Sequence, residues 1–181
     1  LACKAFKHPS NKNRRGTKLE SLTQAIGMGK NIVSTHSLFR MMNEDITKKI
    51  KEKGYTLIID EVLCVWEKYT INKGNSDTAD LDSTDTDKEI ASLISSGIIE
   101  VDPCGVLHWQ WDKFSVVEGT HYEETATLCD TKQLFMANGT VVLWEYPLWV
   151  LESFKEVWIA TYMFESSFMA EYFKLHSIEY K

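Results

Sequence analysis

Residues 56–61 have the sequence Thr-Leu-Ile-Ile-Asp-Glu, a short apolar run that ends in two carboxylates. The run predicts a buried parallel strand, because strands covered on both faces are continuous in their apolar residues. The carboxyl ends of such strands form the sheet edge where open α/β folds bind ligands. There Asp60 can hold Mg²⁺ on nucleotide phosphates, and Glu61 can orient or deprotonate the attacking water. The same residues also fit a strand end that simply faces solvent.

A second motif precedes this strand. Residues 31–35 form a short apolar run, and the segment Val-Ser-Thr-His-Ser-Leu-Phe at 33–39 leads from it into helical periodicity. The order of strand, Thr-His, helix, strand and Asp-Glu resembles the motor domain of superfamily-two helicases and translocases. More closely, residues 12–181 resemble a phage-encoded, DEAD/DEAH-helicase-like ATPase family. The segments that carry this resemblance are KNIVSTHSLF (30–39), YTLIIDEV (55–62), HWQW (108–111) and VWIATYMFESS (157–167).

The resemblance implies both a fold and a site. The fold would be α/β, an incomplete RecA-like P-loop NTPase domain with a mainly parallel sheet, helices on both faces and an inserted antiparallel hairpin region. Asp60 would be the Mg²⁺ ligand and Glu61 the catalytic base. Thr35 and His36 would lie near the nucleic-acid track or brace the Asp-Glu strand. Thr161 would couple the γ-phosphate site to nucleic acid, although the segment that follows it departs from the usual Ser/Thr-Ala-Thr pattern.

The phosphate loop of such an ATPase is missing from the sequence. That loop needs the pattern G-x-x-x-x-G-K-S/T directly after a strand. The nearest candidate, Gly-Met-Gly-Lys at 27–30, has the wrong spacing and lies before a strand, so it is interpreted as a helix C-terminus. We therefore expect a fragment that starts after the loop, uses ATP and Mg²⁺ only with the missing segment and is inactive alone. A sheet that lacks its phosphate-loop strand is also expected to expose an apolar edge and face.

Local signals predict the remaining elements. A capping box at residues 17–20 starts a helix, helical periodicity from Leu38 to Ile50 ends at Gly54, and hairpins turn at 102–105 and at Asn138-Gly139. A helix follows Pro147, a buried strand spans 157–161 and a last helix spans 166–176. The expected organisation is one partial domain, made of a basic loop (1–16), the two-motif region (17–71), an acidic flexible loop (72–87), a helix and hairpin insertion (88–146) and a return to the α/β core (147–181).

Composition limits the function classes. The chain has 181 residues, is 44% hydrophobic and carries a net charge of −6, so any nucleic-acid contact must be local. Four widely spaced cysteines and the lack of an 18-residue apolar run favour a cytoplasmic protein, in the host cell if it is phage-encoded.

Trp109 and Trp111 alternate on one strand and could stack bases. Two alternatives to the ATPase remain, a non-catalytic ATPase-like module that binds protein or nucleic acid and, less favoured, a metal-dependent nuclease.

Overall fold

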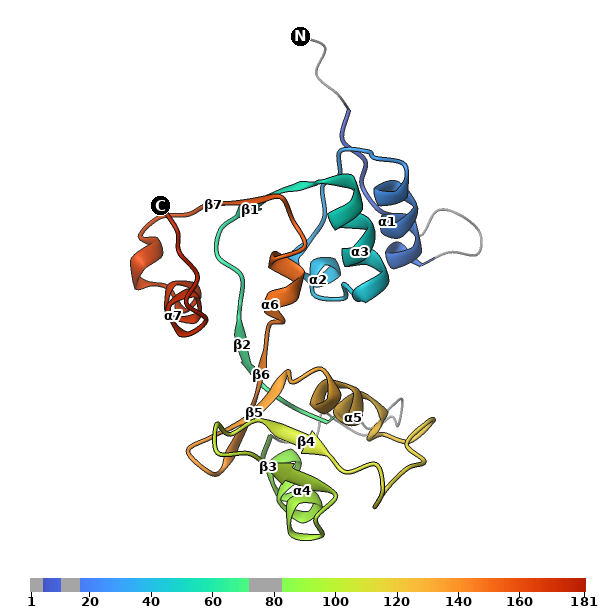
Figure 1. The fold of residues 1–181 in the computed structure, drawn as a ribbon, viewed down its shortest axis with the longest axis vertical. Coiled ribbons are helices and arrows are strands. Elements are labelled where there is room, and N and C mark those ends of the chain that lie inside the picture. Colours follow the sequence, from blue (N-terminus) through green and yellow to red (C-terminus); the bar gives the residue numbers. More distant parts are fainter. Residues whose placement is uncertain (1–4, 11–16, 72–82) are drawn as a thin grey trace. The chain divides into compact units, whose positions relative to one another are not determined.

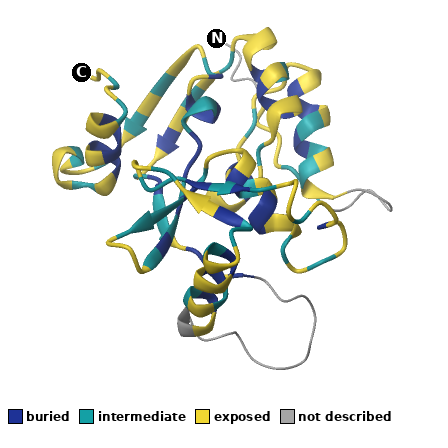
Figure 2. Ribbon diagram, turned by 60° about the horizontal axis from the view of Figure 1, so that its bottom comes forward, coloured by how far each residue is buried: buried dark blue, intermediate teal, exposed yellow. Residues whose placement is uncertain are grey.

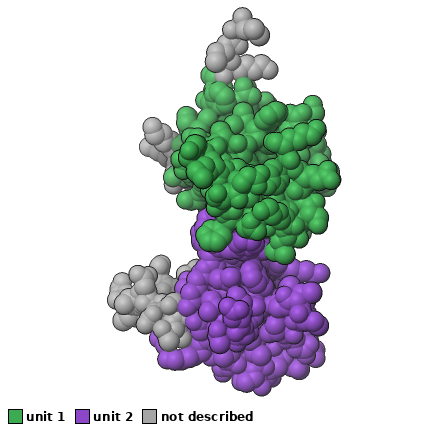
Figure 3. Space-filling view, turned by 90° about the vertical axis from the view of Figure 1, so that its left-hand side faces the viewer, with its two compact units in different colours: residues 1–63, 148–181 green, residues 64–147 purple. Residues whose placement is uncertain are grey.

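The computed structural model describes residues 5–10, 17–71 and 83–181 (Figure 1). These residues form two compact units, one made of the described residues within Leu1–Leu63 and Leu148–Lys181 and the other of those within Cys64–Pro147 (Figure 3). The first unit is assembled from two separate stretches of chain, and the second is continuous. Each unit is described below by itself.

The helices of unit 1 begin and end at the capping residues that the sequence indicates. Helix α1 (Lys18–Gly27) begins with the predicted capping box, in which Glu20 N donates to the Thr17 hydroxyl and Thr17 N donates to the Glu20 carboxylate. The periodicity through residues 38–50 is divided between α2 (His36–Phe39) and α3 (Glu44–Lys53). The break falls at Asn43, whose side chain accepts from Ile46 N and caps a new helix. Gly54, at a φ of 64°, ends α3 as predicted.

These helices enclose the core of unit 1. Each helix contributes one or two buried residues to it, which is the amphipathic arrangement expected for helices packed on one another. They are Leu22, Ile26, Leu38, Ile46 and Ile50.

The parallel sheet is smaller than the sequence predicts. Strands β1 (Thr56–Asp60) and β7 (Glu156–Ala160) pair in parallel, in register from Thr56 opposite Glu156 to Asp60 opposite Ala160. Residues 31–35 contribute only an isolated bridge between Ile32 and Lys7. A mixed α/β fold is confirmed, but among the described residues the sheets are mainly antiparallel.

The prediction that β1 and β7 are buried strands is wrong. Both strands carry exposed positions along their length (Figure 2). Ile58 is 74% exposed and its register partner Trp158 is 64% exposed, so one face of the pair is open. Their apolar composition suits a covered sheet, yet no element of the described chain covers this face.

The chain of unit 1 ends in three short helical segments. They are α6 (Leu148–Leu151), which follows Pro147, the 3₁₀ turn η1 (Phe164–Ser166) and α7 (Phe168–Leu175). Ala170 N donates to the hydroxyl of Ser167, which caps α7.

Unit 2 holds the antiparallel pairs. Both predicted hairpins are confirmed, β3 (Ile99–Val101) with β4 (Leu107–Trp109) and β5 (Leu134–Ala137) with β6 (Val141–Glu145). Asn138 and Gly139 have φ values of 53° and 71°, as a type I′ turn requires. A strand that the sequence did not indicate, β2 (Trp66–Lys68), pairs with β6 and makes the order β2-β6-β5. Two helices complete the unit, α4 (Ser83–Ser95) and α5 (Glu123–Asp130).

The acidic segment 72–87 is not entirely a loop. Residues 72–82 lie outside the described residues, but α4 begins at Ser83, five residues before the predicted helix start. Asp85 lies in its first turn, where a carboxylate is favourable to the helix dipole. Thr86 is fully buried and accepts a hydrogen bond from Ile71 N, which ties this turn to the chain before the segment. The basic loop 1–16 is described only at 5–10, where Lys7 bridges Ile32.

Candidate functional site

The parallel register brings the predicted acids and Thr161 to one edge of the sheet. Asp60, the last residue of β1, lies opposite Ala160, the last residue of β7. Glu61 N donates to the carbonyl of Ala160 at 2.9 Å, so the ladder continues one residue past β1. Thr161 follows Ala160 directly. Asp60 and Glu61 therefore share the carboxyl end of the β1–β7 pair with Thr161, which lies 100 positions after Glu61 in the chain (Figure 1).

Glu61 has an unusual backbone conformation. Its φ of 72° lies in the left-handed region, which non-glycine residues rarely adopt. Such conformations cost about 1–3 kcal/mol each and cluster at functional sites. Met163, two residues after Thr161, has a φ of 54°. Both strand ends therefore lead into a left-handed residue at the same edge of the sheet.

An open cavity of about 580 Å³ in unit 1 connects the Asp-Glu strand with the Thr-His segment. Thr35, His36 and Asp60 all line it, so the structure brings three of the five predicted site residues together. The rest of the wall is mostly apolar and comes from β1, residues 31–33 and the inner faces of α1 and α3. Phe39 and Phe154 also contribute, with ring centroids 6.0 Å apart. Glu61 and Thr161 do not line the cavity.

The structure gives Thr35 a local role. Its side chain caps α2, since Leu38 N donates to the Thr35 hydroxyl at 3.3 Å. His36 is the first residue of α2 and is exposed. The Thr-His order thus has a structural reason, because the threonine starts the helix that orients the histidine at the cavity.

The carboxylate of Asp60 is chemically suited to be a protein ligand of a Mg²⁺ ion bound with a nucleotide. No group of three or more His, Cys, Asp or Glu side chains that could hold a metal occurs in the described part of the chain. Mg²⁺ at such sites is commonly held by one or two carboxylates together with substrate phosphates and water. A single strand-end aspartate is therefore a suitable protein ligand, provided that phosphates are held nearby.

The segment at 27–30 cannot hold those phosphates. Met28 N donates to Gln24 O, Gly29 N to Ile26 O and Lys30 N to Ala25 O, at 2.9–3.1 Å. These amides satisfy the last carbonyls of α1 and are not available to an anion. The interpretation of this segment as a helix C-terminus is confirmed.

The tryptophan pair does not offer two stacking faces. Trp109 is 5% exposed, and its indole N–H donates to Phe114 O at 3.0 Å. Trp111 lies just after β4, is 41% exposed and donates to Asp130 at 3.0 Å. Of the two rings, Trp109 is a core residue of unit 2 and only Trp111 is accessible.

Some residues at the site escaped the sequence analysis. Phe6 and Phe154 line the cavity although neither belongs to a motif. Phe154 carried a usable signal, because it follows the apolar periodicity of Leu148 and Leu151. Phe6 carried none, since it reaches the site through the single bridge between Lys7 and Ile32.

Comparison with known proteins gives one informative similarity. The chain is 29% identical over 167 residues to the SPbeta prophage-derived uncharacterized protein YonV of Bacillus subtilis (strain 168). The match covers 91% of this chain and 37% of that protein, so the chain spans little more than a third of its relative's length. No protein-family model matches the chain, and no solved structure does. A prophage-derived relative accords with the phage origin that the sequence resemblance implies.

No helix in the described ranges has the length and apolar character needed to cross a membrane.

Proposed function

We propose that this chain is the Asp-Glu-bearing part of a phage helicase-like, nucleic-acid-dependent ATPase. The observation that carries the proposal is the parallel register of β1 and β7, which sets Asp60, Glu61 and Thr161 at one sheet edge. Ligands of open α/β sheets bind at that edge. The cavity that Asp60 shares with Thr35 and His36 extends the site toward the Thr-His segment.

Each residue has a distinct task in this proposal. Asp60 would hold the Mg²⁺ ion, which when bound would supply positive charge to the nucleotide phosphates. Glu61 holds the attacking water and accepts its proton, in a position set by its left-handed backbone. Thr161 links that edge to nucleic acid, and His36 contacts the nucleic acid from the start of α2. The amides and lysine of the phosphate loop come from polypeptide outside residues 1–181, so the 181 residues alone do not hydrolyse ATP.

ATP hydrolysis by the product of the longest natural reading frame that contains this chain tests the proposal. We expect hydrolysis that single-stranded DNA or RNA stimulates. Glu61→Gln lowers kcat by about 100- to 10,000-fold, the range for loss of a general base, with little change in ATP binding. Asp60→Asn weakens Mg²⁺-dependent nucleotide binding as well.

Matched controls separate these effects from a general loss of charge. Glu52→Gln makes the same chemical change on an exposed residue of α3, and Asp112→Asn does so in unit 2. Both are expected to keep full activity. Unchanged turnover in Glu61→Gln would remove the assignment of the catalytic base.

A binding module is the second candidate, because the open face at Ile58 and Trp158, which a missing neighbouring strand also explains, fits a docking surface as well. Exposed apolar surface of this kind marks interaction sites. Absence of hydrolysis, together with the absence of a phosphate loop from the whole reading frame, would select this alternative.

A further inference from the structure

The strands of unit 2 lie in one row and share two faces. An isolated bridge pairs Val106 with Phe135, and Met136 N donates to Gly105 O at 2.7 Å, so β4 lies beside β5. The strands therefore follow the order β3-β4-β5-β6-β2. Side chains alternate between the two faces along each strand. The residues of the inner face are all buried, namely Ile99, Leu107, Trp109, Leu134, Val142 and Trp144.

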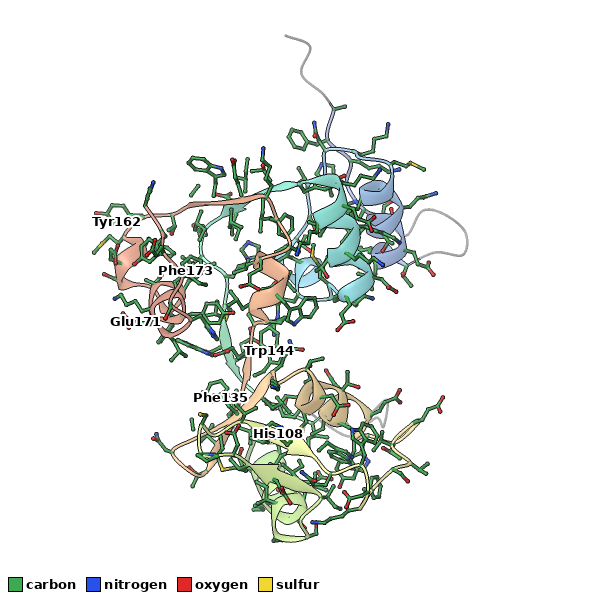
Figure 4. All side chains as sticks on the ribbon, viewed as in Figure 1. His108, Phe135, Trp144, Tyr162, Glu171 and Phe173 are labelled. Carbon is green, nitrogen blue, oxygen red and sulfur yellow. The ribbon has the colours of Figure 1, made fainter. Side chains whose placement is uncertain are left out.

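The outer face contains no buried residue, yet its centre is apolar. The central residues are Trp66, Val106, Phe135, Ala137, Val141 and Leu143, all half-buried. Figure 4 labels Phe135 on this face and Trp144 on the inner face of the neighbouring strand. An antiparallel sheet that leaves one face to water normally alternates apolar with polar side chains. Strands β5 and β6 do not alternate, because Leu-Phe-Met-Ala and Val-Val-Leu-Trp are apolar on both faces. The outer face thus has the composition of a covered surface.

The borders of the outer face are acidic. Glu100 and Asp102 continue this face across β3, and Glu145 ends it on β6. Lys68 of β2 also lies on this face, but its ammonium is paired with Asp87 at 2.9 Å. Residues 64–147 hold 15 of the 26 acidic residues of the chain and only five of its 20 lysines and arginines. This charge repels the phosphates of nucleic acid and a second copy of unit 2, and it attracts a basic partner.

The width of the apolar centre fits one helix. Neighbouring strands lie about 4.8 Å apart, so the three strands β5, β6 and β2 span about 10 Å. An α-helix with its side chains has a diameter of about 10 Å. Sheet faces are covered either by helices or by another sheet, and the acidic borders oppose a second copy of this sheet.

We propose that the outer face of the unit 2 sheet binds an amphipathic α-helix of a partner protein. The apolar stripe of that helix packs on Phe135 and Leu143, and its lysines and arginines lie toward the acidic borders. This inference does not depend on the ATPase proposal, because Thr35, His36, Asp60, Glu61 and Thr161 all belong to unit 1.

Peptide binding to the product of the longest natural reading frame that contains this chain tests the proposal. The probe is a fluorescein-labelled amphipathic peptide of leucine and lysine, about 18 residues or five helical turns long. A matched peptide carries glutamate in place of lysine. We expect saturable binding of the basic peptide, at least about 10-fold tighter than that of the acidic peptide and weakened by added NaCl. Equal binding of the two peptides would overturn the proposal. So would no binding of the basic peptide, which would mean that the rest of the polypeptide already covers the face.

Variants locate the binding surface. Leu143→Lys puts a charge at the centre of the outer face and is expected to weaken binding of the basic peptide by at least about 10-fold. Val116→Lys is the matched control, because it adds the same charge at an apolar residue that is 74% exposed and lies outside the sheet. Ala137→Lys obstructs the outer face without removing a large side chain, and it replaces Leu143→Lys if near-ultraviolet circular dichroism shows that the latter does not fold. Equal weakening by the face variant and the control would overturn the proposal, since charge alone would then explain binding.

Other occupants of the outer face give different results. If Phe135→Ser weakens binding of a single-stranded oligo-dT by at least about 10-fold and leaves peptide binding unchanged, the face stacks bases. If sedimentation shows dimers that Leu143→Lys abolishes, the face binds a second copy of the chain. Either result would overturn the proposal.

Discussion

At the scale of single residues, the left-handed backbone of Glu61 has a cost in stability that can be measured. A left-handed backbone costs an L-residue about 1–2 kcal/mol through its Cβ. Glycine avoids that cost but loses about 0.5–1 kcal/mol through its greater freedom in the unfolded chain. We therefore expect Glu61→Gly to raise the free energy of unfolding by up to about 1.5 kcal/mol. Urea denaturation followed by circular dichroism measures the change.

Glu156→Gly is the matched control, because Glu156 begins β7 in an extended conformation. There glycine only adds freedom to the unfolded chain, and we expect the free energy of unfolding to fall by about 0.5–1 kcal/mol. If both glycine variants destabilise the protein equally, Glu61 does not adopt the left-handed conformation in solution.

The cysteines differ in reactivity for a physical reason. Burial, with a smaller contribution from the charge of Asp130, raises the pKa of the Cys129 thiol to about 12. Alkylation requires the thiolate, so Cys129 is expected to resist iodoacetamide at pH 8, whereas the exposed Cys64 and Cys104 react. Mass spectrometry of the native and the urea-unfolded protein checks this. Labelling of Cys129 in the native protein at the rate of Cys104 would show that α5 is not packed as described.

At the scale of elements, Asp102 organises the β3–β4 turn. Its carboxylate accepts from Cys104 N at 2.8 Å and Val106 N at 2.9 Å, and its second oxygen lies 3.1 Å from His108 Nε2. The hydrogen bond with His108, followed by that from Val106 N, lowers the pKa of Asp102 below its ordinary value of 3.8. A lowered folded-state pKa stabilises the hairpin above pH 3.8, and this contribution is lost as the pH falls through the folded-state pKa.

The Asp102→Asn variant is expected to keep the turn's shape but lose this pH dependence. Urea midpoints of the wild type and the variant should therefore differ more at pH 6 than at pH 2.5. Their measurement at the two pH values checks the sign. A difference that grows as the pH falls would contradict the role of the ionised carboxylate.

The sequence predicts these elements well where the signal is local. The capping box at Thr17, the stop at Gly54 and the turn at Asn138-Gly139 each depend on neighbouring residues, and each is confirmed. Strand β2 was missed because its three residues have no turn signal and are defined only by pairing with β6. The predicted strand at 31–35 is reduced to one bridge for the same reason, since pairing partners are not encoded locally.

At the scale of the whole molecule, the sequence predicted the two strands that carry Asp60 and Thr161 but not what surrounds them. The register of β1 with β7, the cavity at Thr35, His36 and Asp60, and the open face at Trp158 all depend on contacts between distant segments. An apolar strand has the same composition whether its face is covered or open. Its burial therefore follows from what packs on it, and the prediction of buried strands failed for that reason.

The division into two units gives the last prediction. Unit 2, Cys64–Pro147, is continuous, and the sheets β2-β6-β5 and β3-β4 lie wholly within it. Its ends are tied together by the bond from Tyr146 N to Val65 O at 2.8 Å and by Trp66 Nε1 donating to Glu145 at 2.6 Å. A fragment of residues 64–147 is therefore expected to unfold in urea in one cooperative transition. Before unfolding it should show the near-ultraviolet circular dichroism of packed aromatic rings.

A shorter fragment, residues 83–147, is the control. It lacks β2 and the buried hydrogen bond between Tyr69 and Thr125, and it is expected to lose both the cooperative transition and the near-ultraviolet signal. Equal cooperativity in the two fragments would mean that β2 is dispensable, and none in either would mean that unit 2 needs the rest of the chain to fold.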